Sequence, residues 1–144
     1  MKVDIKKQLQ FLDLGDLVNC IEDQEMHAML YIEKSFDERL EILLENLIAL
    51  KETKLIAKLI NAAGFKYKEA SVEGIDYSNR KFDKSLIINL MKMSFVDSST
   101  NLIITGPTGS GKTYLGCAIG KEGCKNKYRT LYLRCALLTK KLDD

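Results

Sequence analysis

A glycine-rich stretch, GPTGSGKT at residues 106–113, constrains the fold of this chain more than any other feature. It holds three of the nine glycines and the only proline in a chain of 144 residues. An apolar run at residues 102–104 precedes it, and a pattern typical of an amphipathic helix follows from Thr113 to about Lys125. Glycine permits backbone turns that are sterically closed to other residues, so successive N–H groups can converge on one anion. The stretch therefore predicts a phosphate-binding loop between a buried strand and a helix.

The stretch fits the Walker A pattern, G-x-x-x-x-G-K-[ST]. In this pattern Lys112 brings a mobile positive charge to the β- and γ-phosphates, and the hydroxyl group of Thr113 is a ligand for Mg²⁺. The helix that begins near Lys112 adds unpaired N–H donors and its positive dipole end. A glycine-rich turn without a ligand is the structural alternative. The predicted phosphate-binding residues are Gly106, Pro107, Thr108, Gly109, Ser110, Gly111, Lys112 and Thr113.

Upstream of this stretch the pattern is helical. Apolar residues recur at helical spacing through the first 30 or so residues, with a bend expected at Gly15. Ser35 and Glu38 form a capping box that begins a long helix, and Gly64 is a suitable end for it. After a looser connector, Asp83 is expected to cap a helix over residues 84–93. A second strand is expected at residues 130–134, followed by the start of another helix.

Composition is typical of a soluble globular protein, with 46% apolar and 29% charged residues. No apolar run approaches the roughly 20 residues that span a bilayer, and the N-terminus lacks a signal-peptide core, so we expect a cytoplasmic protein without a membrane segment. The four cysteines form no C-x-x-C pair, which favours reduced thiols; Cys117 and Cys124 are expected on the buried face of the helix after the loop. His27 is the only histidine, so a metal site made of several histidines is not expected.

Charge is distributed unevenly along the chain. Residues 1–50 hold 5 Lys and Arg against 11 Asp and Glu, a net charge of −6, whereas residues 51–144 hold 17 against 9, a net charge of +8. A basic second part suits an anionic ligand or nucleic acid. Solvated charges on a helix-rich surface are the alternative explanation, which also applies to Lys51, Lys54 and Lys58 on the polar side of the long helix.

The segment NLIITGPTGSGKTYLGCAIGKEGCKNKYRTLYLR, residues 101–134, closely resembles the start of the ATPase module of IstB-like proteins, the ATP-binding helpers of insertion-sequence transposition. That family belongs with the DnaC helicase loaders among the AAA+ ATPases. Residues 35–77 resemble the helical N-terminal region of the family, and RKFDKSLIINL resembles the segment that leads into the first strand. The resemblance covers nearly the whole chain. It implies an α/β fold: a helical N-terminal domain at residues 1–70, then the first βαβ part of a P-loop AAA+ ATPase domain at residues 71–144.

The resemblance also implies ligands and partners. ATP and Mg²⁺ would bind at residues 106–113, with Thr113 as the metal ligand. A transposase would be the partner, DNA a possible one, and self-association would occur in full-length members. For residues 75–77 the resemblance leaves two alternatives, a position near the adenine and an apolar anchor of the connector on the sheet. Tyr132 and Arg134 would have structural roles in the second strand.

One departure from the family pattern concerns catalysis. An AAA+ ATPase uses a Walker B acidic motif at the end of its third strand, a polar sensor residue and an arginine finger, and this chain ends before that strand. Asp143 and Asp144 follow a helical pattern instead of a strand, so they do not make a Walker B motif. We therefore expect an incomplete sheet with open strand edges, no catalytic residues, weak ATP binding and negligible hydrolysis.

Three functions remain open from the sequence. The first is an IstB-like transposition helper, and the second is a DnaC-like loader of a replicative helicase that uses similar residues. The third is a non-enzymatic module whose helices bind a partner and whose loop is a relic. A small-molecule kinase is disfavoured, because it needs catalytic and lid residues beyond residue 144. The aromatic residues Tyr67, Tyr77 and Phe82 could stack on bases, but ordinary packing explains them as readily.

Overall fold

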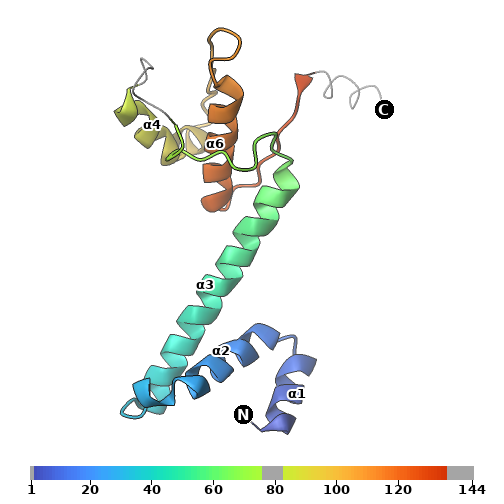
Figure 1. Cartoon of the computed structure of the whole chain (residues 1–144), viewed down its shortest axis with the longest axis vertical. Coiled ribbons are helices and arrows are strands. Elements are labelled where there is room, and N and C mark those ends of the chain that lie inside the picture. The colour runs from blue at the N-terminus through green and yellow to red at the C-terminus, as the bar shows by residue number, and fades with distance from the viewer. Residues whose placement is uncertain (1, 76–82, 136–144) are drawn as a thin grey trace. The chain divides into compact units, whose positions relative to one another are not determined.

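The computed structural model describes residues 2–75 and 83–135. In these residues the chain forms a series of helices, shown in Figure 1: α1 (Val3–Phe11), α2 (Gly15–Met26), the short 3₁₀ helix η1 (Ala28–Leu30), α3 (Phe36–Ala63), α4 (Lys84–Met91), α5 (Ser94–Asp97) and α6 (Lys112–Lys125). Contacts divide the chain into two compact units, Met1–Lys54 and Leu55–Asp144. None of the described helices has the length and apolar character needed to cross a membrane.

The first unit confirms the predicted helical start of the chain. The expected bend at Gly15 is a complete break, because α1 ends at Phe11 and Asp13 adopts a left-handed backbone conformation with φ of 56°. Gln24 is buried, and its side chain is satisfied by Arg39: its amide nitrogen donates to the Arg39 carbonyl oxygen at 2.9 Å, and its amide oxygen accepts from Nε at 3.3 Å. Lys54 forms an ion pair with Asp16, so a carboxylate of the same unit balances its positive charge.

Helix α3 begins and ends as the sequence predicts. The backbone N–H of Ser35 donates to the Glu38 carboxylate at 2.7 Å, and the N–H of Glu38 donates to the Ser35 hydroxyl oxygen at 3.3 Å, which completes the capping box. The hydrogen bonds from the backbone and side chain of Ser35 hold the pKa of Glu38 below its usual value. The helix ends at Ala63, and Gly64 follows with φ of 67°, a left-handed conformation that favours glycine.

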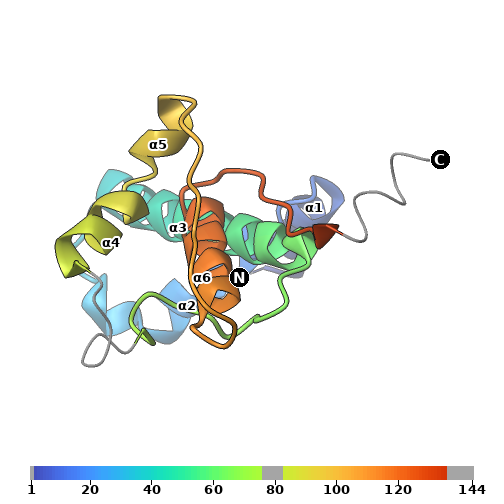
Figure 2. The ribbon, with the colours of Figure 1, turned by 90° about the horizontal axis from the view of Figure 1, so that it is seen from above.

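The core of the second unit lies around α6. One cluster joins α6 to the end of α3 and to the segment after it (residues 65–75, here called the connector): Ala63, Phe65, Ala70, Cys117, Ala118 and Cys124. A second cluster joins α6 to α4 and its surroundings: Ile75, Ile87, Met93, Leu115 and Ile119. Helix α4 lies beside α6 in both Figure 1 and Figure 2. The predicted burial of Cys117 and Cys124 is confirmed, and the cap of α4 is confirmed by the Ser85 N–H, which donates to the Asp83 carboxylate at 2.9 Å.

The predicted βαβ arrangement is not observed. Among the described residues none belongs to a β-strand, and both segments expected to be strands, residues 102–104 and 130–134, are irregular. A strand is defined by hydrogen bonds to a neighbouring strand, and these two segments do not pair with each other or with another described segment. The backbone N–H of Tyr132 instead donates to the carbonyl oxygen of Ala63 at 2.8 Å. Ile103 is 82% exposed and Leu131 is 63% exposed, so apolar side chains suited to a buried sheet remain uncovered.

The fit of the connector against α6 gives a prediction about two glycines of that helix. A Cβ atom at Gly120 would lie 2.6 Å from Cε1 of Phe65, whereas one at Gly116 would have no atom within 4 Å. Alanine normally stabilises a helix by up to about 1 kcal/mol relative to glycine. At Gly120 the overlap with a buried ring should outweigh this gain, since overpacking a core costs about 1–3 kcal/mol.

We therefore expect Gly120→Ala to lower the free energy of unfolding by about 1–3 kcal/mol. Gly116→Ala is the matched control in the same helix and should leave it unchanged or raise it by up to about 1 kcal/mol. Urea unfolding followed by circular dichroism measures both. Equal effects of the two substitutions would show that Phe65 does not pack on α6 as described.

Candidate functional site

The glycine-rich loop (residues 106–113) forms a tight turn at the start of α6. The backbone N–H of Ser110 donates to the carbonyl oxygen of Pro107 at 3.3 Å and closes the turn. Gly109 and Gly111 have φ angles of 79° and 86°, a left-handed conformation that side chains disfavour. These are two of the three glycines singled out from the sequence, and their left-handed conformation allows the tight turn.

The loop leads directly into the N-terminus of α6, where backbone donors are free. Gly111 is the N-cap residue and has no side chain to accept a hydrogen bond. The first hydrogen bond at this end joins the N–H of Leu115 to the carbonyl oxygen of Gly111 at 2.9 Å. The N–H groups of Lys112, Thr113 and Tyr114 therefore have no acceptor within the helix, and the helix dipole adds a partial positive charge at the same place.

Lys112 folds back over the loop. Its ammonium group donates to the carbonyl oxygen of Pro107 at 2.5 Å, five residues earlier in the chain. A Cβ atom at Gly106 would lie 3.1 Å from the Ser110 hydroxyl oxygen and 3.8 Å from Cδ of Lys112, so the start of the loop lies close to its second half. The acceptor that holds the Lys112 ammonium group is thus a neutral carbonyl oxygen. An anionic ligand can take its place and form a stronger, charge-assisted hydrogen bond with Lys112.

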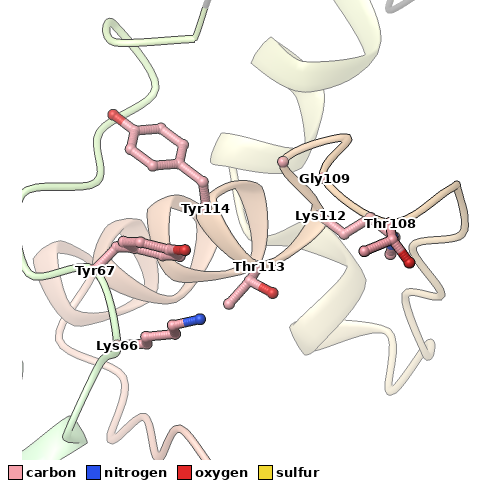
Figure 3. Close-up of a pocket in the computed structure, with 8 residues that line it drawn as sticks. Lys66, Tyr67, Thr108, Gly109, Lys112, Thr113 and Tyr114 are labelled. Atoms are coloured by element: carbon pink, nitrogen blue, oxygen red, sulfur yellow. The ribbon is translucent and has the colours of Figure 1, made fainter.

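A cavity of about 350 Å³ opens beside the loop and the start of α6. Of the eight predicted residues, five line it: Thr108, Gly109, Gly111, Lys112 and Thr113. Gly106, Pro107 and Ser110 belong to the same loop but are not among the lining residues. Three further residues line the cavity: Tyr114 of α6, and Lys66 and Tyr67 of the connector, as Figure 3 shows.

Sequence reasoning missed Lys66 and placed a different part of the connector at the site. Ile75 is buried in the core against α4 and α6, which agrees with its alternative role as an apolar anchor. Tyr77 and Phe82 lie outside the described residues, as do Asp143 and Asp144. For this part of the connector, the only signal in the sequence was a lysine followed by an aromatic residue, Lys66 and Tyr67, shortly after the end of the helix at Gly64.

The connector is fixed to α6 by polar contacts as well as by its core residues. The backbone N–H of Ser71 donates to the Tyr114 hydroxyl oxygen at 3.3 Å, and the ammonium group of Lys121 donates to the Lys68 carbonyl oxygen at 2.6 Å. The Glu73 carboxylate accepts from its own backbone N–H and from the Ser71 hydroxyl, and these bonds, together with the nearby lysines of α6, hold its pKa below the usual value. The position of Lys66 and Tyr67 beside the loop therefore follows from a well-anchored backbone.

Several residues singled out from the sequence lie outside the cavity. Tyr132 packs against the core cluster of the connector, and Arg134 is exposed. Cys20, Cys117, Cys124 and Cys135 are free thiols, and His27 is exposed at the end of α2. Within the part of the chain that the structure describes, no group of three or more His, Cys, Asp or Glu residues is arranged to hold a metal ion.

The polar groups around the cavity are nearly all hydrogen-bond donors. They comprise two ammonium groups, from Lys66 and Lys112, the hydroxyl groups of Thr108 and Thr113, and the free N–H groups at the start of α6. No Asp or Glu is among the described residues that line the cavity. Donors and positive charge without a compensating carboxylate suit an anionic ligand with several oxygen atoms, such as a chain of phosphates.

Comparison with known proteins gives one family and several relatives. The family model described as IstB-like ATP binding protein matches residues 7–144. A Pseudomonas fluorescens protein named as an ATP-binding protein of insertion sequence IS1162 is 36% identical over 140 residues, which are 94% of this chain and 58% of that protein. A Sinorhizobium fredii protein, y4pL, named as an insertion sequence ATP-binding protein, is 34% identical over 101 residues, 69% of this chain and 41% of its own length. A Geobacillus stearothermophilus protein named for ATP binding in insertion sequence IS5376 is 32% identical over 100 residues, 69% of this chain and 39% of its own length. The chain thus spans about 40–60% of the length of these relatives.

Proposed function

Since this chain belongs to the family of IstB-like ATP-binding proteins, we propose that it binds ATP through its glycine-rich loop as a helper protein of insertion-sequence transposition. One observation carries the proposal: the free backbone N–H groups at the start of α6 and the ammonium group of Lys112 belong to one cavity beside the loop. Relatives named as insertion sequence ATP-binding proteins support the same ligand.

In the proposed complex the whole loop, Gly106 to Thr113, surrounds the phosphates. Gly109 and Gly111 set the backbone turns that direct the N–H groups, and Lys112 exchanges the Pro107 carbonyl oxygen for a phosphate oxygen. The hydroxyl group of Thr113, which is exposed at the cavity, is the proposed protein ligand of Mg²⁺. Mg²⁺ usually keeps several waters, and Thr113 would supply one protein oxygen to it beside the phosphates.

We further propose that this chain hydrolyses ATP negligibly. Phosphoryl transfer needs a group that positions the attacking water and charges that stabilise the transition state. The described lining of the cavity supplies cations and N–H donors but no carboxylate, so it supports binding better than it supports activation of water. The functional division that we propose is a helical domain at residues 1–70 and the start of an AAA+ ATPase domain at residues 71–144.

The proposed partners follow from the insertion-sequence context of the relatives. A transposase encoded by the same element is the expected protein partner. DNA and self-association are further proposals, and the net charge of +8 on residues 51–144 is compatible with an approach to DNA.

The test of the proposed function is thermal unfolding combined with a phosphate-release assay. We expect Mg²⁺-ATP to raise the melting temperature, because a ligand that binds only the folded state stabilises it by about 2.7 kcal/mol at 100 times its Kd. EDTA should reduce this stabilisation, because it removes the Mg²⁺ that would bind together with the phosphates. The same samples should release no phosphate above the buffer rate. An unchanged melting temperature would favour a relic loop, and steady phosphate release that Lys112→Ala abolishes would show that the chain is a competent ATPase.

A further inference from the structure

Lys66 and Tyr67 reach the cavity from a segment that is not part of the glycine-rich loop. Their position is determined on both sides: Phe65, which is 5% exposed, packs against α6, and the Lys68 carbonyl oxygen accepts a hydrogen bond from Lys121 of that helix at 2.6 Å. The backbone of Lys66 therefore lies between two anchors on α6. Its side chain is exposed and extends along the cavity wall.

The ammonium group of Lys66 is held near the cavity by an aromatic ring. It lies 5.1 Å from the centroid of the Tyr67 ring, within the range of a cation–π contact. The Tyr67 ring in turn lies 6.1 Å from the ring of Tyr114, the third residue of α6. Among the described residues Lys66 forms no ion pair with a carboxylate.

Figure 3 shows that the two lysines reach the cavity from different sides of Thr113. Lys112 is directed towards Thr108, at the tip of the loop, whereas Lys66 extends from the connector towards the Thr113 side of α6. A chain of phosphates that lies across the start of α6 would carry negative charge near both Lys112 and Lys66. One lysine would neutralise only part of that charge.

We propose that Lys66 is a second phosphate-binding cation of this site and that Tyr67 is the residue that positions it. The inference rests on the proposed function, because it assigns a further contact to the same nucleotide. Lys66 acts on the phosphates and not on the base, since its ammonium group shares a cavity with the loop, Lys112 and Thr113. The Tyr67 ring limits the freedom of a long side chain and so reduces the entropy lost when Lys66 contacts a phosphate.

The experiment measures Mg²⁺-ATP binding to the whole chain by isothermal titration calorimetry at several salt concentrations. We expect Lys66→Ala to raise the Kd about five- to tenfold, as for the loss of one hydrogen bond to a charged group at an exposed site. Its Kd should also increase less steeply with salt than that of the unsubstituted chain, because one charge pair is missing. Lys68→Ala is the matched control: it removes the same charge two residues away, from a side chain that does not line the cavity, and should change the Kd less than about twofold.

Two further comparisons separate the roles of Lys66 and Tyr67. Lys66→Ala should weaken the binding of tripolyphosphate, which lacks base and sugar, by the same factor as the binding of ATP.

The Tyr67→Phe variant should bind ATP as the unsubstituted chain does. Tyr67→Leu should weaken ATP binding about two- to threefold, the equivalent of a weak cation–π contact. In a chain that already carries Lys66→Ala, Tyr67→Leu should have no additional effect, which a purely structural role of the ring would not predict.

The outcomes that would contradict this inference differ from those that would contradict the proposed function. Unchanged ATP binding by Lys66→Ala, alongside clear binding by the unsubstituted chain, would overturn the role of Lys66 alone. A loss for ATP with none for tripolyphosphate would overturn the assignment to phosphate. Absence of ATP binding by the unsubstituted chain would overturn the proposed function and this inference together.

Discussion

Lys112→Ala is expected to weaken Mg²⁺-ATP binding about 100-fold, at the upper end of what one hydrogen bond to a charged group contributes. Lys112 already lies over the loop, with its ammonium group 2.5 Å from the Pro107 carbonyl oxygen. The charge is therefore in place before the ligand arrives, and little side-chain entropy remains to be lost on binding. Alanine removes both the charge and the donor, and nothing else on the loop can replace them.

Calorimetry and ligand-induced thermal stabilisation measure this loss. Lys84→Ala, at the exposed first residue of α4, is the matched control, because it removes the same charge from the same unit at a position away from the cavity. It should bind Mg²⁺-ATP like the unsubstituted chain. The melting temperature of Lys112→Ala without ligand should be close to that of the unsubstituted chain, since the side chain is not part of either core cluster. Full ATP affinity of the Lys112→Ala variant would contradict the proposal that ATP binds at the glycine-rich loop.

Gly111→Ala is expected to have the second largest effect, a loss of ATP affinity of more than about tenfold. Gly111 has φ of 86° and precedes the free N–H groups of Lys112 and Thr113. A left-handed conformation costs an ordinary residue about 1–2 kcal/mol, so alanine favours a different backbone angle at this position. That change would turn the N–H groups that follow away from their common centre, and a misdirected donor contributes little to binding.

Gly64→Ala is the control that separates the effect of backbone strain on stability from an effect on ATP binding. Gly64 also has a left-handed conformation, with φ of 67°, and a Cβ atom there would have no atom within 4 Å, but it ends α3 and does not line the cavity. Both substitutions should lower the free energy of unfolding by about 1–2 kcal/mol. Only Gly111→Ala should also lose ATP affinity. If the two variants bound ATP equally well, the conformation of Gly111 would have no role in the site.

Local chemistry explains why the helices could be predicted from the sequence. The capping box of Ser35 and Glu38, the stop at Gly64 and the cap at Asp83 each depend on residues within a few positions of one another, so a local pattern is sufficient. The glycine-rich loop is of the same kind, because its turn and the first residues of the helix after it lie within eight consecutive residues.

The expected strands show the limit of local patterns. Residues 102–104 and 130–134 have the apolar composition of buried strands, but a strand also needs a neighbour that accepts and donates backbone hydrogen bonds. Without such a neighbour, Ile103 and Leu131 remain exposed. The apolar composition of these two segments therefore suits a buried sheet, but the described residues form no sheet.

Lys66 shows a different limit. It reaches the cavity because Phe65 packs against Gly120, a contact between residues 55 positions apart that no short pattern encodes. The absence of a side chain at Gly120 makes room for the ring and so determines where the connector lies. Helical propensity alone gives no reason for a glycine at this position in α6.

The most direct test of the central proposal is the response of individual backbone amides to the nucleotide. In ¹H–¹⁵N correlation spectra of the whole chain, addition of Mg²⁺-ATP should shift the amide resonances of Gly109, Gly111, Lys112, Thr113 and Tyr114 more than any others. Each of these N–H groups either belongs to the loop or lies at the unpaired start of α6. Unchanged loop amides, or a response confined to α1 and α2, would contradict a phosphate site at the glycine-rich loop.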